Sequence, residues 1–136
     1  MRNKFKLNVF GISLIECMVV IVIIGIMLLI WRFTSKGHEQ IAIANEGYAF
    51  IEKVVAQERI YRTTHSDFLP VGKTSKNDSL KINAYDNKYF SKFSVEVTAD
   101  GIKVFVYGNT NTKAKDMQIY GTYNSRSNQL EYKESW

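Results

Sequence analysis

An unbroken apolar run near the start of the chain restricts what it can fold into more than any other feature. Residues 12–33 read ISLIECMVVIVIIGIMLLIWRF, and no charged side chain occurs from Cys17 to Trp31. At about 1.5 Å per residue, a helix from Ile12 to Trp31 is about 30 Å long, which matches the hydrocarbon thickness of a bilayer. We therefore predict a membrane-spanning helix over this run.

Two kinds of cleaved export signal fit the run poorly. A secretory signal peptide has an apolar region of roughly 7–15 residues followed by a small-x-small cleavage site. Here the run is longer and ends in Trp31, Arg32 and Phe33. A lipoprotein signal needs small residues before its cysteine, whereas Ile15 and Glu16 precede Cys17. A retained membrane helix is therefore the better interpretation.

The rest of the 136-residue chain allows one small domain. Its formal net charge is +5, but three of the cations, Arg2, Lys4 and Lys6, lie in the first 11 residues. Without that leader the chain has 15 basic and 13 acidic residues, which argues against nucleic acid as a partner. Cys17 is the single cysteine, so no intrachain disulfide can form.

After the apolar run the pattern becomes amphipathic, as in a helix with one buried face. Apolar residues recur at spacings of three and four: Ile41, Ala44, Tyr48, Ile51 and Val55, broadened by Ala49, Val54 and Ala56. The charged and polar residues, Glu58 among them, fall mostly elsewhere. We predict one helix from about Ile12 to about Tyr61 that ends before Pro70, which cannot continue it.

The C-terminal part of the chain carries strand signals. Residues 71–92 are rich in polar side chains and predict a surface connection with at most one short helical or extended piece. Alternating patterns at residues 93–97 and 102–106 flank a turn with Asp100-Gly101, and residues 117–123 and 129–132 form a second hairpin. The predicted fold is α+β, with a long N-terminal helix packed on an antiparallel sheet of three or four strands.

A carboxylate at the edge of the apolar helix needs an explanation. A charge at the centre of a membrane span costs about 2.5–3.5 kcal/mol on insertion scales and marks a functional site by default. No lysine or arginine lies within a turn of Glu16. Cleavage after Gly11 would give Ile12 a free amine in the same membrane layer. Glu16 and that amine would then form an ion pair, within one chain or between two.

The segment Gly11-Ile12-Ser13-Leu14-Ile15-Glu16 resembles the class III signal of type IV prepilins and type II secretion pseudopilins. The resemblance implies that a prepilin peptidase cuts after Gly11 and methylates the amine of Ile12. It also implies that Glu16, with Ser13 and Leu14 of the same motif, acts in assembly by neutralising the N-terminus of a neighbouring subunit. The chain departs from the family in having Phe10 before the glycine, and in lacking a proline within the apolar run and a C-terminal disulfide loop.

Gly25 falls where pilins commonly have a glycine within this helix. Glycine is about 1 kcal/mol less favourable than alanine inside a helix, so the helix could loosen here on assembly. Close packing against another helix is an equally good interpretation.

The resemblance implies three parts: a removed leader (1–11), a transmembrane and filament-core helix (12–33) and an exported domain (34–136). The implied function is a structural subunit of a type IV pilus-like filament, major or minor, serving adhesion, motility or DNA uptake. The alternatives are a pseudopilin of a type II secretion system and, in another class, an uncleaved membrane-anchored binding domain.

The same resemblance implies the partners and the location. The partners are other copies of the chain or related subunits, the prepilin peptidase, an inner-membrane assembly platform and, before assembly, the bilayer. The chain would cross the bacterial inner membrane once with a cytoplasmic N-terminus. It would then enter an extracellular pilus or a periplasmic pseudopilus.

Candidates for other chemistry are weak. His38 and His65 lie far apart without further metal ligands, and adjacent residues such as those at 64–67 cannot meet in triad geometry. We therefore expect no enzyme and no cofactor. Pseudopilins often bind calcium through acidic groups in a C-terminal loop, but Asp100 reads as a turn residue and Asp116 is isolated. Several aromatic residues could form an adhesive patch or a half-buried sheet face: Tyr107, Tyr120, Tyr123, Tyr132 and Trp136.

Overall fold

The computed structural model describes residues 13–135, which divide into two compact units between His38 and Glu39. Helix α1 (Leu14–His65) begins in the first unit and ends in the second. The single long helix predicted from the sequence is confirmed, and it ends one turn later than Tyr61. Its last residue is followed by Ser66, which adopts a φ of 68° and donates its N–H to the Arg62 carbonyl at 2.9 Å.

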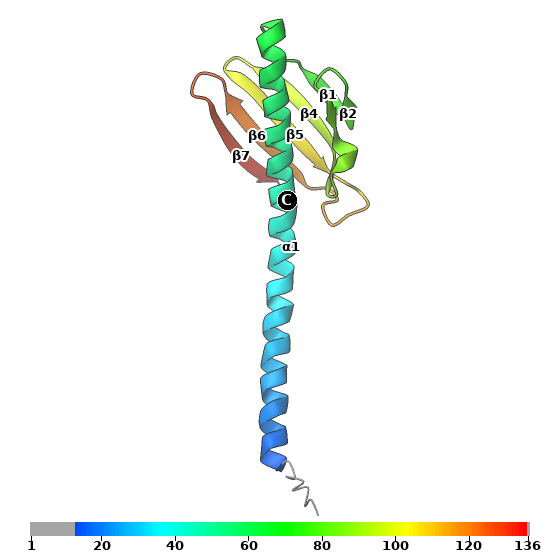
Figure 1. Cartoon of the computed structure of the whole chain (residues 1–136), viewed down its shortest axis with the longest axis vertical. Coiled ribbons are helices and arrows are strands. Elements are labelled where there is room, and N and C mark those ends of the chain that lie inside the picture. The colour runs from blue at the N-terminus through cyan, green and yellow to red at the C-terminus, as the bar shows by residue number, and fades with distance from the viewer. Residues whose placement is uncertain (1–12, 136) are drawn as a thin grey trace, which may run out of the picture. The chain divides into compact units, whose positions relative to one another are not determined.

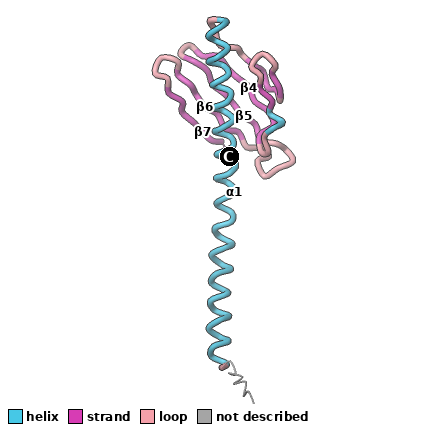
Figure 2. Tube along the Cα trace, in the orientation of Figure 1, coloured by secondary structure: helices cyan, strands magenta, loops and turns pink. Residues whose placement is uncertain are grey.

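The second unit packs the C-terminal part of α1 against one face of an antiparallel sheet (Figure 1). Five strands form this sheet in the order β1-β4-β5-β6-β7. Their bounds are β1 (Val71–Thr74), β4 (Phe90–Thr98), β5 (Gly101–Gly108), β6 (Gln118–Asn124) and β7 (Gln129–Ser135). The tube in Figure 2 shows the helix crossing the strands. The predicted α+β arrangement is therefore confirmed.

The sheet has one strand more than the three or four that the sequence predicted. Strand β1 joins the edge through pairing of Val71 with Val95 and of Thr74 with Phe93. Only Val71 of its four residues is buried, so β1 shows no alternating pattern. Neighbouring residues form a short hairpin of β2 (Lys76–Asn77) and β3 (Ile82–Asn83), followed by a 3-10 turn, η1 (Ala84–Asp86).

The buried face of α1 overlaps the predicted apolar stripe but is rotated slightly about the helix axis. The stripe included Ile41, Ala49 and Ala56, which are exposed. Ile51, Val54 and Val55 of the predicted stripe are buried in the core as expected, and Ile43 and Phe50 join them from outside the stripe. The prediction missed Ile43 and Phe50 because apolar residues occur on both faces of this part of the helix, and sequence does not show which face the sheet covers.

The two predicted hairpins are confirmed, with one change at the first turn. The loop of β4–β5 is Ala99–Asp100, and Gly101 already pairs with Thr98. A Cβ atom at Gly101 would lie 1.9 Å from the Tyr123 carbonyl oxygen, so glycine is required for a close backbone approach rather than for its dihedral angles. At the start of the β6–β7 loop, the side chain of Asn124, the last residue of β6, accepts hydrogen bonds from the N–H groups of Arg126 and Ser127.

Candidate functional site

The start of α1 is held by a reciprocal pair of hydrogen bonds. The Ser13 N–H donates to Glu16 Oε2 at 2.8 Å, and the Glu16 N–H donates to Ser13 Oγ at 3.2 Å. This is a capping box, which satisfies two backbone donors that a helix N-terminus leaves without partners. The motif residues Ser13 and Glu16 therefore meet in space, and they define where the helix begins.

The Glu16 carboxylate is the charged group of this site. Its side chain contributes negative charge to the first turn of α1, where the helix dipole stabilises an anion. Within residues 13–135, the ion pairs are Lys76–Asp78, Lys113–Glu39 and Arg126–Asp100, and none of them includes Glu16. One carboxylate can accept about four hydrogen bonds, so Glu16 keeps capacity for a cationic donor besides the Ser13 amide.

Two of the predicted site residues, Gly11 and Ile12, lie outside the described residues. Leu14, the third residue of the predicted assembly motif, is 81% exposed at the first position of α1. Gly25 lies further along the helix, and a Cβ atom built there would meet no other group of the described chain within 4 Å. Both interpretations of Gly25, loosening of the helix and close packing on another helix, remain predictions.

The apolar helix that carries this site is uncovered. Every residue of α1 from Leu14 to Phe33 is exposed, including the large side chains of Ile21, Leu29 and Trp31. The run is long and apolar enough to cross a membrane, judged by its length and composition. Because exposed apolar surface costs about 25 cal/mol per Å² in water, this surface requires lipid or other helices around it.

The weaker candidates are placed as ordinary structural groups. His65 stacks on Tyr61 with ring centroids 4.0 Å apart, at the end of α1. Asp100 forms an ion pair with Arg126 at 3.1 Å beside the hairpin turns. Asp116 is exposed in a turn with a φ of 65°. In the part of the chain that the structure describes, no three His, Cys, Asp or Glu side chains gather as metal ligands would.

The sequence did not reveal that Glu58 is buried. This residue is 0% exposed on the core side of α1, where its Oε2 accepts a hydrogen bond from the Leu69 N–H at 2.9 Å. Its Oε1 has no hydrogen-bond partner among the described residues. Burial raises the pKa of the Glu58 carboxyl, and the hydrogen bond from Leu69 opposes part of that rise. Glu58 ties the chain beyond α1 to the helix, so its role is structural.

Two tyrosines fasten β7 to the exposed side of α1. The Tyr48 hydroxyl donates to Glu134, and the Tyr132 hydroxyl donates to Glu52 at 2.7 Å. Their rings lie 4.7 Å apart. Burial and the neighbouring Glu52 raise the pKa of Tyr132 to about 12. Tyr132, which the sequence placed in a sheet face or an adhesive patch, therefore belongs to the contact between helix and sheet.

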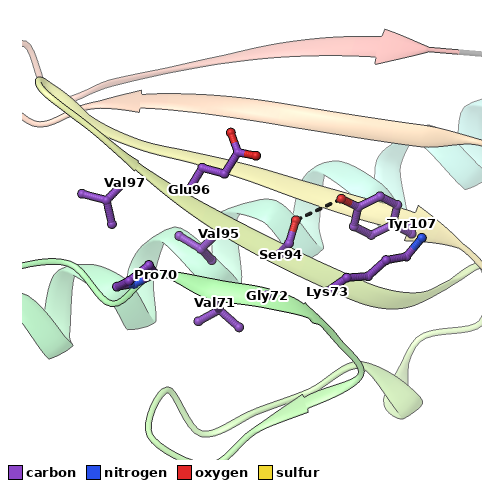
Figure 3. A pocket seen from close by; sticks show the side chains of 9 residues that line it. All are labelled: Pro70, Val71, Gly72, Lys73, Ser94, Val95, Glu96, Val97 and Tyr107. Atoms are coloured by element: carbon purple, nitrogen blue, oxygen red, sulfur yellow. Dashed lines mark hydrogen bonds between the residues drawn. The ribbon is translucent and has the colours of Figure 1, made fainter.

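An open groove of about 670 Å³ lies at the β1 edge of the sheet (Figure 3). Lys73, Ser94, Glu96 and Tyr107 are among the residues that line it. The hydroxyl groups of Ser94 and Tyr107 lie 3.0 Å apart within hydrogen-bonding distance.

The comparisons with known proteins agree with the start of the chain. A family model described as the prokaryotic N-terminal methylation motif matches residues 6–31. This match covers Gly11, Ile12, the capping box and the apolar run as far as Trp31. No curated protein and no solved structure gives a significant match to the chain.

Proposed function

We propose, on the premise that residues 6–31 carry the class III signal of type IV pilins and pseudopilins, that the chain is a structural subunit of a pilus-like filament. The motif implies processing by a prepilin peptidase and assembly into filaments in general. It belongs to a structural family that is not known for enzymes, and the proposed role is likewise structural. The observation that carries the proposal is the capping box of Ser13 and Glu16 at the head of an uncovered apolar helix.

In the proposed processing step, the peptidase hydrolyses the bond after Gly11 with water and then transfers a methyl group from a methyl-donor cofactor of its own to the new amine of Ile12. The amine then carries a positive charge one helical turn from Glu16. Desolvation of a single charge in hydrocarbon is costly, but a close ion pair recovers part of that cost. Cleavage would therefore give the mature chain an apolar first residue that carries a charged amine. This cation would suit Glu16, the one carboxylate of the apolar run.

The capping box explains why Glu16 could fix the axial register of a filament. Its Oε2 already accepts the Ser13 N–H, which holds the carboxylate at the head of its own helix. A neighbouring amine would reach it only at one axial offset between two subunits. A heterologous contact that repeats without closing generates a helical filament. Ser13 would act as a positioning residue, and Leu14 would supply apolar contact beside the pair.

The uncovered helix supplies the proposed driving force of assembly. While the run lies in the membrane, helices gain no hydrophobic energy by pairing, because lipid is as apolar as their side chains. Once subunits leave the bilayer, packing of the exposed residues from Leu14 to Phe33 against neighbouring copies would keep them from water. A filament core of such helices needs no disulfide.

The proposed location follows from the same elements. The cations of the leader favour a cytoplasmic N-terminus, since short basic flanks stay inside. The chain would then be anchored in the inner membrane before assembly, with residues 34–136 exported. The assembly platform in that membrane and other pilin-like subunits are the proposed partners. The final structure would be an extracellular pilus or a periplasmic pseudopilus.

The first test is mass spectrometry of the mature N-terminus from cells with and without an active prepilin peptidase. We expect a chain that starts at Ile12 with one added methyl group, and only when the peptidase is active. An intact leader in both strains would overturn the proposal and favour an uncleaved membrane-anchored domain.

A second measurement separates processing from assembly. Glu16→Gln removes the charge but keeps the shape, so we expect normal cleavage with loss of the chain from sheared filaments. Glu131→Gln, at an exposed position of β7, is the matched control and should assemble normally. Equal assembly of both variants would show that the Glu16 charge does not fix the register.

A further inference from the structure

The face of the sheet that points away from α1 has an unusual set of side chains. On β5, Ile102, Val104 and Val106 are buried against the helix, so the alternating residues Lys103, Phe105 and Tyr107 point to the opposite side. We call this side the outer sheet face. It consists of these three residues and the residues in register with them on β4, β6 and β7.

Register places three aromatic rings together in the middle of this face. Tyr120 of β6 lies opposite Phe105 of β5, with ring centroids 5.5 Å apart. Tyr107 stands two residues further along β5, which is about 6.8 Å at 3.4 Å per residue. All three rings are half-buried, so each keeps part of its surface open to solvent.

Lysines surround the rings. The Lys103 ammonium lies 5.0 Å from the Phe105 centroid and 4.4 Å from that of Tyr120. Lys73, which reaches over from β1, lies 3.9 Å from the Tyr107 centroid at the edge of the groove (Figure 3). Lys92 and Lys133 are exposed and stand in register with Tyr107 and Tyr120.

The acidic residues of this face lie in a different cross-strand row from the rings, although Glu96 lines the same groove as Lys73 and Tyr107. Glu96 and Glu131 both lie in the cross-strand row that contains Lys103 and Thr122. The two rows that contain the rings hold Ser94, Phe105, Tyr120 and Lys133 in one, and Lys92, Tyr107, Gln118 and Ser135 in the other. Along the described strands, these two rows therefore carry positive charge without acidic residues.

We propose that the outer sheet face binds single-stranded nucleic acid. Bases would stack on Phe105, Tyr107 and Tyr120, and phosphates would contact Lys73, Lys92 and Lys133. Sequence-tolerant binding of single strands uses this combination of stacking rings and a basic surface. The bases of a duplex are already stacked on each other. A duplex could therefore contact the lysines through its phosphates, but its bases could not stack on the aromatic residues.

This inference goes beyond the proposed filament and does not depend on it. It also differs from the expectation drawn from the net charge of the chain, which argued against nucleic acid as a partner. The chain without its leader carries only a small positive excess. The fold, however, gathers four lysines around three rings, namely Lys92, Lys103 and Lys133 through strand register and Lys73 through its contact with Tyr107. Binding depends on charge at the site rather than on the total.

The test uses the full-length chain in a nonionic detergent and a fluorescent oligomer of about 20 thymidines, longer than the roughly 4–16 nucleotides that one such platform covers. Fluorescence anisotropy measures the dissociation constant at several salt concentrations. Three phosphate contacts predict a slope of log K against log salt of about −2, at roughly −0.7 per contact. A duplex of the same length should bind at least tenfold more weakly.

Two sets of variants test the site itself. The triple variant Lys73→Gln, Lys92→Gln and Lys133→Gln should weaken binding at least tenfold and bring the salt slope close to zero. The matched control changes three exposed lysines elsewhere, Lys53→Gln, Lys81→Gln and Lys115→Gln, and should bind like the unaltered chain. Phe105→Leu with Tyr120→Leu should weaken binding about tenfold or more, since each stacked base contributes about five- to hundredfold.

Several results would overturn the inference. Equal losses in the two lysine triples would mean general electrostatic attraction, and unchanged binding after loss of the rings would mean that bases do not stack there. Binding to vesicles with anionic headgroups but not to the oligomer would assign the face to a lipid surface. Circular dichroism melting of each variant ensures that a loss reflects the site rather than unfolding. A chain that is cleaved and assembled yet does not bind the oligomer would refute this inference alone.

Discussion

The two parts of α1 bury their apolar residues in different ways. From Leu14 to Phe33 the apolar side chains occur all round the helix, and every one is exposed. From Glu39 to His65 the buried residues lie on one face, against the sheet, and charged residues occupy much of the rest. A helix that is apolar all round belongs in a membrane or a large core, whereas an amphipathic one belongs on the surface of a domain.

This difference shows where the stability of each part must come from. The second unit has its own core, with Phe93, Val104 and Ile119 almost fully buried beneath the helix. The first part of α1 has no core within the described chain, so its apolar surface depends on surroundings such as lipid or other helices. One helix therefore links a segment that depends on its surroundings to a domain that depends on its own packing.

The strongest test of this contrast compares two phenylalanines. Phe93 is 0% exposed in the sheet, whereas Phe33 is 77% exposed on α1. Phe93→Ala should lower the free energy of unfolding of the second unit by about 3–5 kcal/mol, because it removes buried surface and leaves a cavity. Phe33→Ala should leave that free energy unchanged. Denaturant titration of the full-length chain in detergent, followed by circular dichroism of the sheet, measures both.

In the assembled state we expect Phe33, rather than Phe93, to matter for the contacts between subunits. Phe33→Ala should weaken the proposed filaments, because it removes apolar surface from their helical core. A large loss of domain stability in Phe33→Ala would contradict the separation of the two parts.

Much of this contrast could be predicted from the sequence, because it depends on periodicity. The sequence predicted a long helix from the continuous apolar run and the amphipathic pattern after it. It predicted an antiparallel sheet later in the chain from the alternation in β4 and β5. The buried face of α1 was harder, since Ile41 and Ile43 are equally apolar and only tertiary packing decides between them. Glu58 was assigned to the polar face by residue type, although it lies four residues after the buried Val54.

Other features depend on pairing between distant residues. Strand β1 has no alternating pattern of its own and exists because β4 offers it an edge. The outer sheet face also needs register, which brings Lys133 next to Tyr120 and Ser94 next to Phe105. The N-terminal methylation motif at residues 6–31 is instead local, so it could be recognised from the sequence alone.

Glycine substitutions in the two parts of α1 should show the same contrast with smaller changes in stability. A Cβ atom at Gly47 would lie 2.6 Å from Ile119 Cδ1 and 3.0 Å from Phe90 Cε2, whereas one at Gly25 meets nothing within 4 Å among the described residues. Gly47→Ala should cost about 1–3 kcal/mol of unfolding free energy through overpacking. Gly25→Ala should leave the domain unaffected and stabilise its own part of the helix by about 1 kcal/mol.

The same denaturant titration measures the effect of Gly47→Ala, and amide hydrogen exchange measures the local effect of Gly25→Ala. If Gly47→Ala were neutral, Ile119 and Phe90 would have room to shift, and the contact of helix with sheet would be looser than the distances indicate. If Gly25→Ala blocked assembly without altering exchange, close packing on another helix would be the better explanation of that glycine.

The smallest expected effect concerns the buried carboxylate. Burial raises the pKa of Glu58 in the folded state above its value of 4.5 in an unfolded chain. The unfolded state therefore loses this proton at a lower pH than the folded state does. The stabilising contribution of the protonated form is complete below pH 4.5 and is lost as the pH rises through the folded-state pKa. Above the folded-state pKa the ionised carboxylate makes folding less favourable than the protonated form does.

Glu58→Gln should remove this dependence while it keeps an oxygen to accept the Leu69 N–H. We expect the variant to be more stable than the unaltered chain at pH 7, by about 1 kcal/mol, and the advantage to shrink at pH 4.5. Glu52→Gln, on the exposed side of α1, is a poor control because Glu52 binds Tyr132, so Glu131→Gln serves instead. A stability advantage that grew toward acidic pH would mean that Glu58 is held as a stabilised carboxylate. The second part of α1 would then contain a charge that the fold favours, as the first part is proposed to do at Glu16.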